Sequence, residues 1–189
     1  MKSETTRRRF VSLVVGVGVS ASMAGCVGGD EELPEPVALS AGQACDVCGM
    51  IIQDHPGPVA QTFYRDNRPE GRGEDEPAWF CSLVCMFDFY YERGEQGWEP
   101  VVGYVTDYSA VDYEVTQEGA TLFVTSHLEA EYFVDSETTT LVVDSDVRGA
   151  MGPSLIPFTD SSEATAFQEE YGGDMMEFGD VSRQLVDSL

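Results

Sequence analysis

Four of the chain's five cysteines fall into two closely spaced pairs. Cys45 and Cys48 are three residues apart, on a turn that the following glycine permits, and the thioether of Met50 comes two positions later. Cys81 and Cys85 are four residues apart, which places both thiols on one face at the start of a helix. A helix N-terminus also favours the thiolate form of cysteine. The two pairs lie within 41 residues of each other, and this arrangement predicts a metal site.

The sulfur ligands indicate a soft metal ion. Four thiolates suit zinc in a closed tetrahedral site, whereas two or three sulfurs combined with methionine suit copper(I). We expect copper(I), with zinc as the alternative. Methionine is common in protein cores, and histidine in a turn is commonly a hydrogen-bonding loop residue, so the additional candidate ligands are less specific. These candidates are His55, Met86 and Met151.

Two other uses of the thiols remain open. In an oxidising compartment the four cysteines could pair as structural disulfides. Cys45 and Cys48 also have the spacing of thiol oxidoreductases, although the sequence does not place them at the start of a helix within a βαβ unit. We find no nucleophilic triad, phosphate-binding loop or informative pair of carboxylates, so we expect a binding protein and not an enzyme.

The first 25 residues have the pattern of an export signal. Three arginines at positions 7–9 precede an apolar stretch that ends at Met23-Ala24-Gly25-Cys26. This resembles a twin-arginine signal followed by a lipobox, and it predicts a protein on the extracytoplasmic face of the cell membrane, anchored by lipid on Cys26. An uncleaved transmembrane helix is the alternative, which the glycine and serine content disfavours. Residues 26–41 are expected to form an acidic linker rich in proline and glycine, and residues 42–189 the metal-binding domain.

The chain beyond the signal is strongly acidic. With Glu4 and the four basic residues of the signal set aside, 33 acidic residues face six arginines and no lysine, a net charge of −27. At molar salt the Debye length falls to about 3 Å, so such a surface stays soluble without opposing folding, and we expect an extreme halophile as the source. The acids are spread along the chain, which favours a solvated surface over a binding surface for cations or a basic partner. Nucleic acid is excluded as a partner because little positive charge remains to neutralise phosphates.

The elements that would position the cysteines are repeated later in the chain. The sequence predicts strands at 59–64, 78–80 and 101–105, and a helix that is capped by Ser82 or Cys81 and ends at Gly94. In the second half it predicts strands at 120–124, 131–134, 155–158 and 175–178, with a helix at 163–171. We therefore expect an α+β fold in which two β-β-α-β units, about 42–109 and 110–189, form one compact domain. Only the first unit carries cysteines.

Several separated motifs resemble the NosL family, the accessory lipoproteins of nitrous oxide reductase. They occur in one order between about Cys45 and Phe178. The motifs are Cys45-x-x-Cys48-Gly49-Met50, Asp54-His55-Pro56-Gly57-Pro58, Trp79-Phe80-Cys81-Ser82, Tyr104-Val105-Thr106-Asp107, Ala150-Met151-Gly152, Ile156-Pro157-Phe158 and Tyr171-Gly172-Gly173.

The resemblance implies a copper(I) chaperone outside the membrane that passes copper to a maturation transporter complex and thence to nitrous oxide reductase, as part of denitrification. It also implies that Cys45, Cys48 and Met50 form the copper-binding segment. Cys85 is not generally required in the family, and together with Phe80-Cys81-Ser82 it resembles the YHS and TRASH-type metal-binding modules. If all four thiols bind one ion, the alternative is a zinc site or a tighter copper site in a protein that serves another copper or metal recipient. If the two cysteine pairs lie apart, we expect a copper shuttle.

Overall fold

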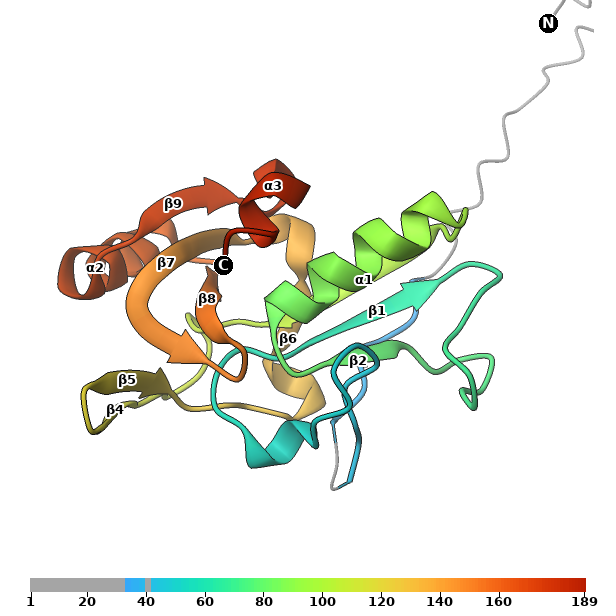
Figure 1. Cartoon of the computed structure of the whole chain (residues 1–189), viewed down its shortest axis with the longest axis horizontal. Coiled ribbons are helices and arrows are strands. Elements are labelled where there is room, and N and C mark those ends of the chain that lie inside the picture. Colours follow the sequence, from blue (N-terminus) through green and yellow to red (C-terminus); the bar gives the residue numbers. More distant parts are fainter. Residues whose placement is uncertain (1–32, 40–41) are drawn as a thin grey trace, which may run out of the picture. The chain divides into compact units, whose positions relative to one another are not determined.

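The computed structural model describes residues 33–39 and 42–189 of the chain (Figure 1). The expected signal at 1–25, the expected lipidation site Cys26 and the first part of the expected linker lie outside the described residues. Among the residues that the structure does describe, no helix is both long and apolar enough to span a membrane.

The first β-β-α-β unit forms a four-stranded antiparallel sheet with a helix packed on it. Its strand order is β2-β1-β3-β6, so β1 lies inside the sheet and β2 at one edge. The helix begins after Ser82, because this residue is extended and its hydroxyl accepts the amide of Cys85 at 3.2 Å. The elements are η1 (Ile52–Asp54), β1 (Ala60–Tyr64), β2 (Ala78–Phe80), α1 (Leu83–Glu95), β3 (Pro100–Thr106) and β6 (Phe133–Asp135).

The second β-β-α-β unit has the same internal order around a different central strand. β7 pairs with β8 along one edge, while its other edge pairs first with β9 and then, in parallel, with β5 of a short hairpin. This architecture confirms the predicted α+β fold of two β-β-α-β units. The remaining elements are β4 (Val115–Glu118), β5 (Thr121–Val124), η2 (Ala130–Tyr132), η3 (Ser136–Thr138), β7 (Thr140–Gly149), β8 (Gly152–Phe158), α2 (Ser161–Tyr171), β9 (Asp174–Glu177), η4 (Phe178–Asp180) and α3 (Arg183–Val186).

The strands that open the second unit differ from the prediction. The segment expected as a strand at 131–134 appears as β6, which joins the first sheet, and the opening strand of the second unit is β7, which the sequence did not predict. The alternation of apolar residues does not predict β7, because Asp144-Ser145-Asp146 interrupts it. The backbone also bends at Asp144, where φ is 54°. The boundary expected near residue 110 therefore does not separate the two sheets.

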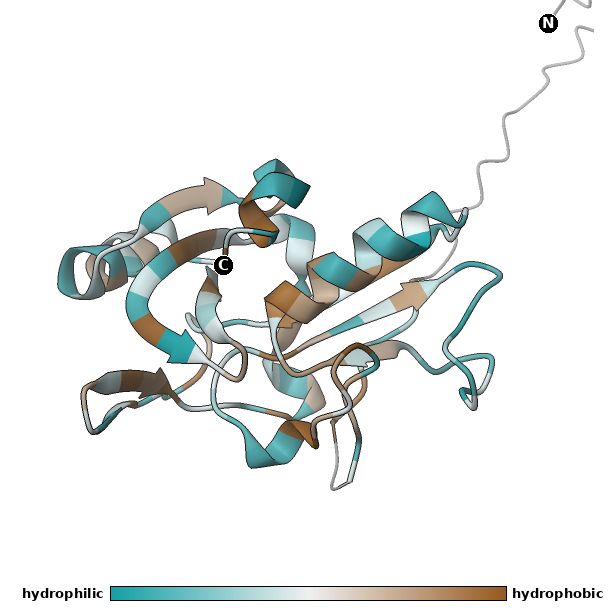
Figure 2. Cartoon of the chain, in the orientation of Figure 1, coloured by the Kyte–Doolittle hydropathy of each residue, from teal (hydrophilic) through white to brown (hydrophobic). Residues whose placement is uncertain are grey.

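Two hydrophobic cores lie on opposite faces of the second sheet. Leu141 and Val143 of β7 contact the core that also contains α1, whereas Val142 contacts the core beneath α2. This is the alternation of a strand that is buried on both faces. The helix α1 contributes its hydrophobic N-terminal turns to the first core, and its C-terminal half is largely hydrophilic (Figure 2). The start of α1 is thus fixed from both sheets.

Part of the expected linker belongs to the folded domain. Val37 exchanges two hydrogen bonds with the buried side chain of Gln61, at 2.9 and 2.8 Å. The amide of Leu39 donates to the carbonyl of Leu128 at 2.8 Å, and the Tyr104 hydroxyl donates to the carbonyl of Pro34 at 2.8 Å. The linker predicted for residues 26–41 is therefore too long, because residues 33–39 are held on the domain by these bonds.

Candidate metal centre

A tight turn presents the first cysteine pair. The amide of Cys45 donates to the carbonyl of Met50, and the amide of Gly49 donates back to the carbonyl of Cys45, both at 2.9 Å. Gly49 has a φ of +74°, which a residue with a side chain adopts only with strain. The glycine thus turns the backbone so that Cys45 and Cys48 are held on one compact loop.

The second pair is presented where β2 passes into α1. Cys81 directly follows β2, and Cys85 occupies the first turn of α1, where its amide is bound by the hydroxyl of the capping residue Ser82. Cys81, Ser82 and Cys85 are all buried. Because the core packs against both β2 and the start of α1, these two thiols have little freedom to move.

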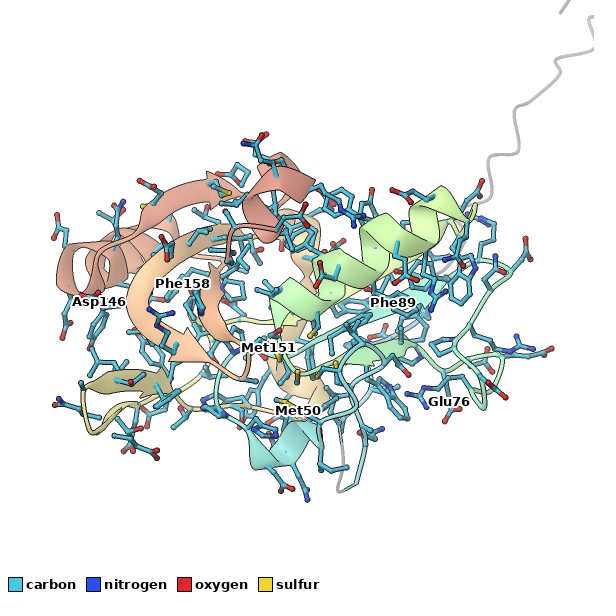
Figure 3. The ribbon with its side chains drawn as sticks, in the orientation of Figure 1. Met50, Glu76, Phe89, Asp146, Met151 and Phe158 are labelled. Atoms are coloured by element: carbon cyan, nitrogen blue, oxygen red, sulfur yellow. The ribbon has the colours of Figure 1, made fainter. Side chains whose placement is uncertain are left out.

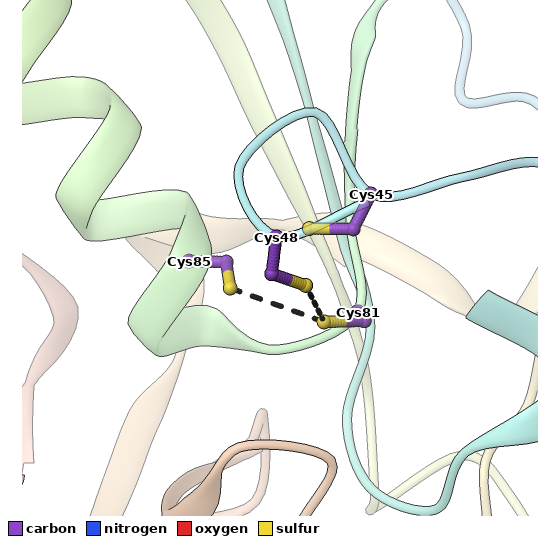
Figure 4. Close-up of side chains that lie close together, drawn as sticks. All are labelled: Cys45, Cys48, Cys81 and Cys85. Atoms are coloured by element: carbon purple, nitrogen blue, oxygen red, sulfur yellow. Dashed lines mark hydrogen bonds between the residues drawn. The ribbon is translucent and has the colours of Figure 1, made fainter. Parts of the chain in front are cut away.

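The structure brings all four thiols together (Figure 4). Their Sγ atoms all lie within 4.8 Å of one another, with Cys48 to Cys81 at 3.4 Å and Cys81 to Cys85 at 3.9 Å. A tetrahedral thiolate site with metal–sulfur bonds of about 2.3 Å has sulfurs about 3.8 Å apart, so this spacing suits a shared ion. Within residues 33–39 and 42–189, no other group of three or more His, Cys, Asp or Glu ligands is found this close.

Exposure to solvent differs among the four thiols. Cys45, Cys81 and Cys85 are buried, whereas Cys48 is the most exposed of the four, with a thiol that is only partly covered. The cluster therefore has three protected sulfurs and one that a partner molecule can reach. None of the four is in a disulfide.

Hydrogen bonds among the thiols distribute their protons unevenly. The bonds from Cys81 and Cys85 hold the pKa of Cys45 far below its usual range. The same hydrogen bonding with Cys45 raises the pKa of Cys81, and it raises the pKa of Cys85 to about 12. The cluster thus favours one thiolate supported by neighbouring S–H donors, and binding of an ion by more of these sulfurs must release protons.

A largely buried ion pair connects the first cysteine loop to the second cysteine pair. Arg72 donates to both carboxylate oxygens of Asp46, at 2.9 and 3.0 Å, and its guanidinium lies 3.3 Å from the ring centre of Trp79. The Asp46 carboxylate also accepts the amide of Trp79 at 2.7 Å, and the Asp46 amide donates to the Trp79 carbonyl at 2.9 Å. Asp46 follows Cys45, and Trp79 lies two residues before Cys81, so these contacts set the position of one pair relative to the other.

Burial makes this carboxylate dependent on its partners. It raises the pKa of Asp46, against the opposing effects of the Trp79 amide and the Arg72 charge. The side chains of Arg72 and Asp46 are only 14% and 13% exposed, and the other ion pairs of the described chain are more exposed. Sequence reasoning missed both residues. The available signals were an acid inside a Cys-x-x-Cys loop and an arginine in a chain with very few basic residues.

The thioether and imidazole candidates lie at different distances from this centre. Met50 ends the cysteine loop and packs at the edge of the core that contains the thiols. Met151 is at the exposed turn between β7 and β8 (Figure 3). Met86 turns its terminal methyl group away toward Gly103 of β3. His55 ends η1 and is not part of the group of four ligand side chains.

The turn that carries Met151 is held against the segment that follows the cysteine loop. Gly57 lies so close to β7 that a Cβ atom there would be 2.6 Å from the Cα of Gly149, and its φ of +101° also requires glycine. The Gly57 amide donates to the carbonyl of Val124 at 2.8 Å. The second unit therefore packs directly against the segment that follows the cysteine loop.

Comparisons with known proteins agree with the resemblance seen in the motifs. The family model described as NosL matches residues 36–186. The chain is 29% identical over 176 residues to "Copper-binding lipoprotein NosL" of Stutzerimonas stutzeri, covering 92% of this chain and 80% of the relative. It is 27% identical over 183 residues to the protein of the same name from Achromobacter cycloclastes, covering 96% and 83%.

A solved structure shows the same fold. It is the crystal structure of the copper chaperone NosL from Shewanella denitrificans, with a TM-score of 0.66 and 23% sequence identity, and the match covers 81% of this chain and 99% of that one. The family match extends over most of the chain and includes every residue of the candidate metal centre. This chain belongs to the NosL family.

Proposed function

We propose that this protein is a copper(I) chaperone whose cargo is carried by Cys45, Cys48, Cys81 and Cys85 and delivered for the maturation of nitrous oxide reductase. The observation that carries the proposal is the convergence of four sulfur atoms within 4.8 Å, with one of the four exposed. Soft thiolate ligands select copper(I) and zinc over harder ions. The names of the two relatives, copper-binding lipoproteins, favour copper.

The uneven burial of the thiols supports transfer of the ion over permanent storage. A chaperone must exchange ligands with its partner, so at least one sulfur has to be reachable while the others hold the ion. Cys48 is the sulfur that can be reached, and its neighbour Val47 is 43% exposed. Met151, on the turn between β7 and β8, is 44% exposed. We assign the exchange of ligands to Cys48, and we propose that the soft thioethers of Met50 and Met151 assist the exchange.

The proposed location is the extracytoplasmic face of the membrane, with a lipid on Cys26. The twin-arginine pattern and the lipobox support it, as do the names of the two lipoprotein relatives. The partners would be the copper-maturation transporter complex and nitrous oxide reductase. The net charge of −27 beyond the signal supports a halophilic source, so exchange between proteins would rely on short-range contacts instead of long-range attraction.

A competition experiment tests the metal assignment. Reduced mature protein in high salt is titrated with copper(I) in the presence of a colorimetric copper(I) chelator, and the bound copper is counted before and after zinc is added. We expect about one copper(I) per chain, retained against equimolar zinc. Uptake of zinc with no competition for copper(I) would instead assign a structural zinc site.

The oxidation state of the native thiols tests the remaining alternative. Alkylation of the isolated protein, followed by mass spectrometry, is expected to label Cys45, Cys48, Cys81 and Cys85 once the metal has been removed. Finding all four already oxidised in pairs would replace the carrier by a disulfide-clamped domain. Turnover of a dithiol substrate would support a thiol redox protein.

A further inference from the structure

A cavity lies against the middle of α1. It has a volume of about 350 Å³, within the range of small-ligand pockets, and lies between the middle of α1, the first half of β3, and the short helices η3 and η4. None of the four candidate metal ligands lines it. The sequence analysis gave no indication of this cavity.

The floor of the cavity has an unpaired polar group. The hydroxyl of Thr62 is buried, has no hydrogen-bond partner in the described structure, and belongs to a residue that lines the cavity. A buried hydroxyl without a partner costs free energy, so a ligand that donates a hydrogen bond to it would be favoured. Beside it, Gly103 keeps the floor open, because a Cβ atom there would approach Met86 Cε to 2.6 Å and Ser136 Oγ to 2.9 Å.

The walls and rim indicate which ligand would fit. Tyr90 and Tyr91 contribute aromatic rings, Asp135 and Glu137 contribute carboxylates, and no lysine, arginine or histidine lines the cavity. Carboxylates and aromatic faces both favour a cation, while the apolar wall favours an aliphatic stem. From this combination we infer that the cavity binds an arginine or lysine side chain presented by a protein partner.

The mouth of the cavity supports a protein as the source of this side chain. Four large hydrophobic residues are exposed in the described chain, and two of them, Leu33 at 46% and Tyr90 at 43%, line this cavity. The other two are Val47, in the cysteine loop, and Met151, at the turn between β7 and β8. An exposed apolar rim around a pocket for a charged anchor is typical of a protein interface.

High salt is compatible with this recognition. At molar ionic strength the Debye length is about 3 Å, so long-range attraction to the acidic surface is lost, but a pair in direct contact inside a pocket is screened much less. The pocket would thus select a basic anchor by contact. This inference does not depend on copper binding and can be tested on metal-free protein.

A pair of matched peptides provides the test. The mature, reduced, metal-free protein labelled with ¹⁵N is titrated in high salt with the peptide acetyl-Gly-Arg-Gly-amide, and with the same peptide carrying neutral citrulline in place of arginine. We expect saturable amide shifts at Gly103 and Glu137 with the arginine peptide and none with the citrulline peptide. Equal binding of both peptides, or no saturable shift with either, would overturn the inference.

Variants locate the binding and separate the possible occupants. Thr62→Val keeps the shape of the side chain and should weaken binding about fivefold, and Glu137→Gln should weaken it about threefold, whereas Glu118→Gln on the distant hairpin should have no effect. Free ethylguanidinium binding as tightly as the peptide would contradict a protein partner and assign a small organic cation. A dimer that forms with concentration and is lost in Glu137→Gln would likewise contradict it and assign a second copy of this chain.

Discussion

In the two β-β-α-β units, the residue between the second strand and the helix cap has different roles. In the first unit a buried phenylalanine, Phe80, is followed by Cys81 and the cap of α1; in the second, the buried Phe158 is followed by Thr159 and the cap of α2. The Cys81 thiol faces three other thiols. The Thr159 hydroxyl instead donates to the buried carboxylate of Asp107 at 2.6 Å, and its amide donates to the same group at 3.0 Å.

This difference teaches what the fold itself contributes. The passage from an edge strand to a helix is a rigid place where a side chain is fixed by packing on both sides. In one unit this rigidity positions a ligand, and in the other it connects the units, because Asp107 directly follows β3 of the first unit. The chemistry therefore resides in the residue types, and the precision of their placement resides in the repeated architecture.

Replacing the sulfur at this position should have the largest effect. Cys81→Ser removes the thiol that lies 3.4 Å from Cys48 and 3.9 Å from Cys85, so copper(I) affinity should fall at least about a hundredfold. Competition against a copper(I) chelator measures it. Thr159→Ser, which keeps the hydroxyl in the second unit, is the matched control and should leave the affinity unchanged. Wild-type affinity in Cys81→Ser would exclude Cys81 as a ligand.

In the second unit we expect a substitution to reduce stability and to leave copper binding unchanged. Asp107→Ala leaves the amides of Ser109 and Thr159 and the Thr159 hydroxyl without their acceptor, so the free energy of unfolding should fall by about 3 kcal/mol. Denaturant unfolding measures this loss, and the folded variant should still bind one copper(I) per chain. Asp107→Asn, which retains one acceptor oxygen, should lose less. A loss of copper stoichiometry without a loss of stability would contradict the separation of roles.

Loss of the ion pair between Arg72 and Asp46, within the first unit, should have an intermediate effect on copper(I) affinity. Arg72→Gln leaves the buried Asp46 carboxylate without its charged partner and frees the loop that carries Cys45 and Cys48, so copper(I) affinity should fall about tenfold. The matched control is Arg68→Gln in the same segment, because the ion pair that Arg68 makes with Glu74, at 3.8 Å, is exposed. Equal affinity in both variants would show that Arg72 does not position the centre.

Local signals in the sequence were sufficient for much of this architecture. The cap at Ser82, the helix after it and the four candidate cysteines follow from neighbouring residues alone. The strand β7 does not, because its bend at Asp144 is stabilised by pairing with β5, β8 and β9, which are distant or follow it in the chain. Tertiary context overrides local pattern there.

The convergence of the cysteine pairs was likewise beyond local reasoning. Whether Cys81 and Cys85 approach Cys45 and Cys48 depends on the contacts of Asp46 with Arg72 and Trp79, which join residues 26 and 33 positions apart. Spacing alone left both a four-sulfur centre and two separate pairs possible. The structure brings the four thiols together, and the exposed position of Cys48 supports the ligand exchange proposed for it.

Removing the helix caps should have the smallest effect on stability, and only the cap of the second unit should show a pH dependence. Ser82→Ala removes an uncharged cap and should cost about 1 kcal/mol at any pH. In the second unit, hydrogen bonds from Ser162 lower the pKa of Asp160 below its ordinary value of 3.8. The charged cap therefore contributes stability above that value, and the contribution is lost as pH falls through the lower pKa of the folded state.

Asp160→Asn isolates this contribution, because asparagine still caps a helix but carries no charge. The variant should be less stable than the wild type near neutral pH, and the difference should shrink as pH falls below 3.8 and through the lower pKa of the folded state, whereas the difference between Ser82→Ala and the wild type should stay constant. Denaturant midpoints measured across this range give both curves. Because the amide bound by Ser82 belongs to Cys85, only Ser82→Ala should also release copper(I) faster. A faster release in Asp160→Asn would mean that the caps are coupled through the shared core.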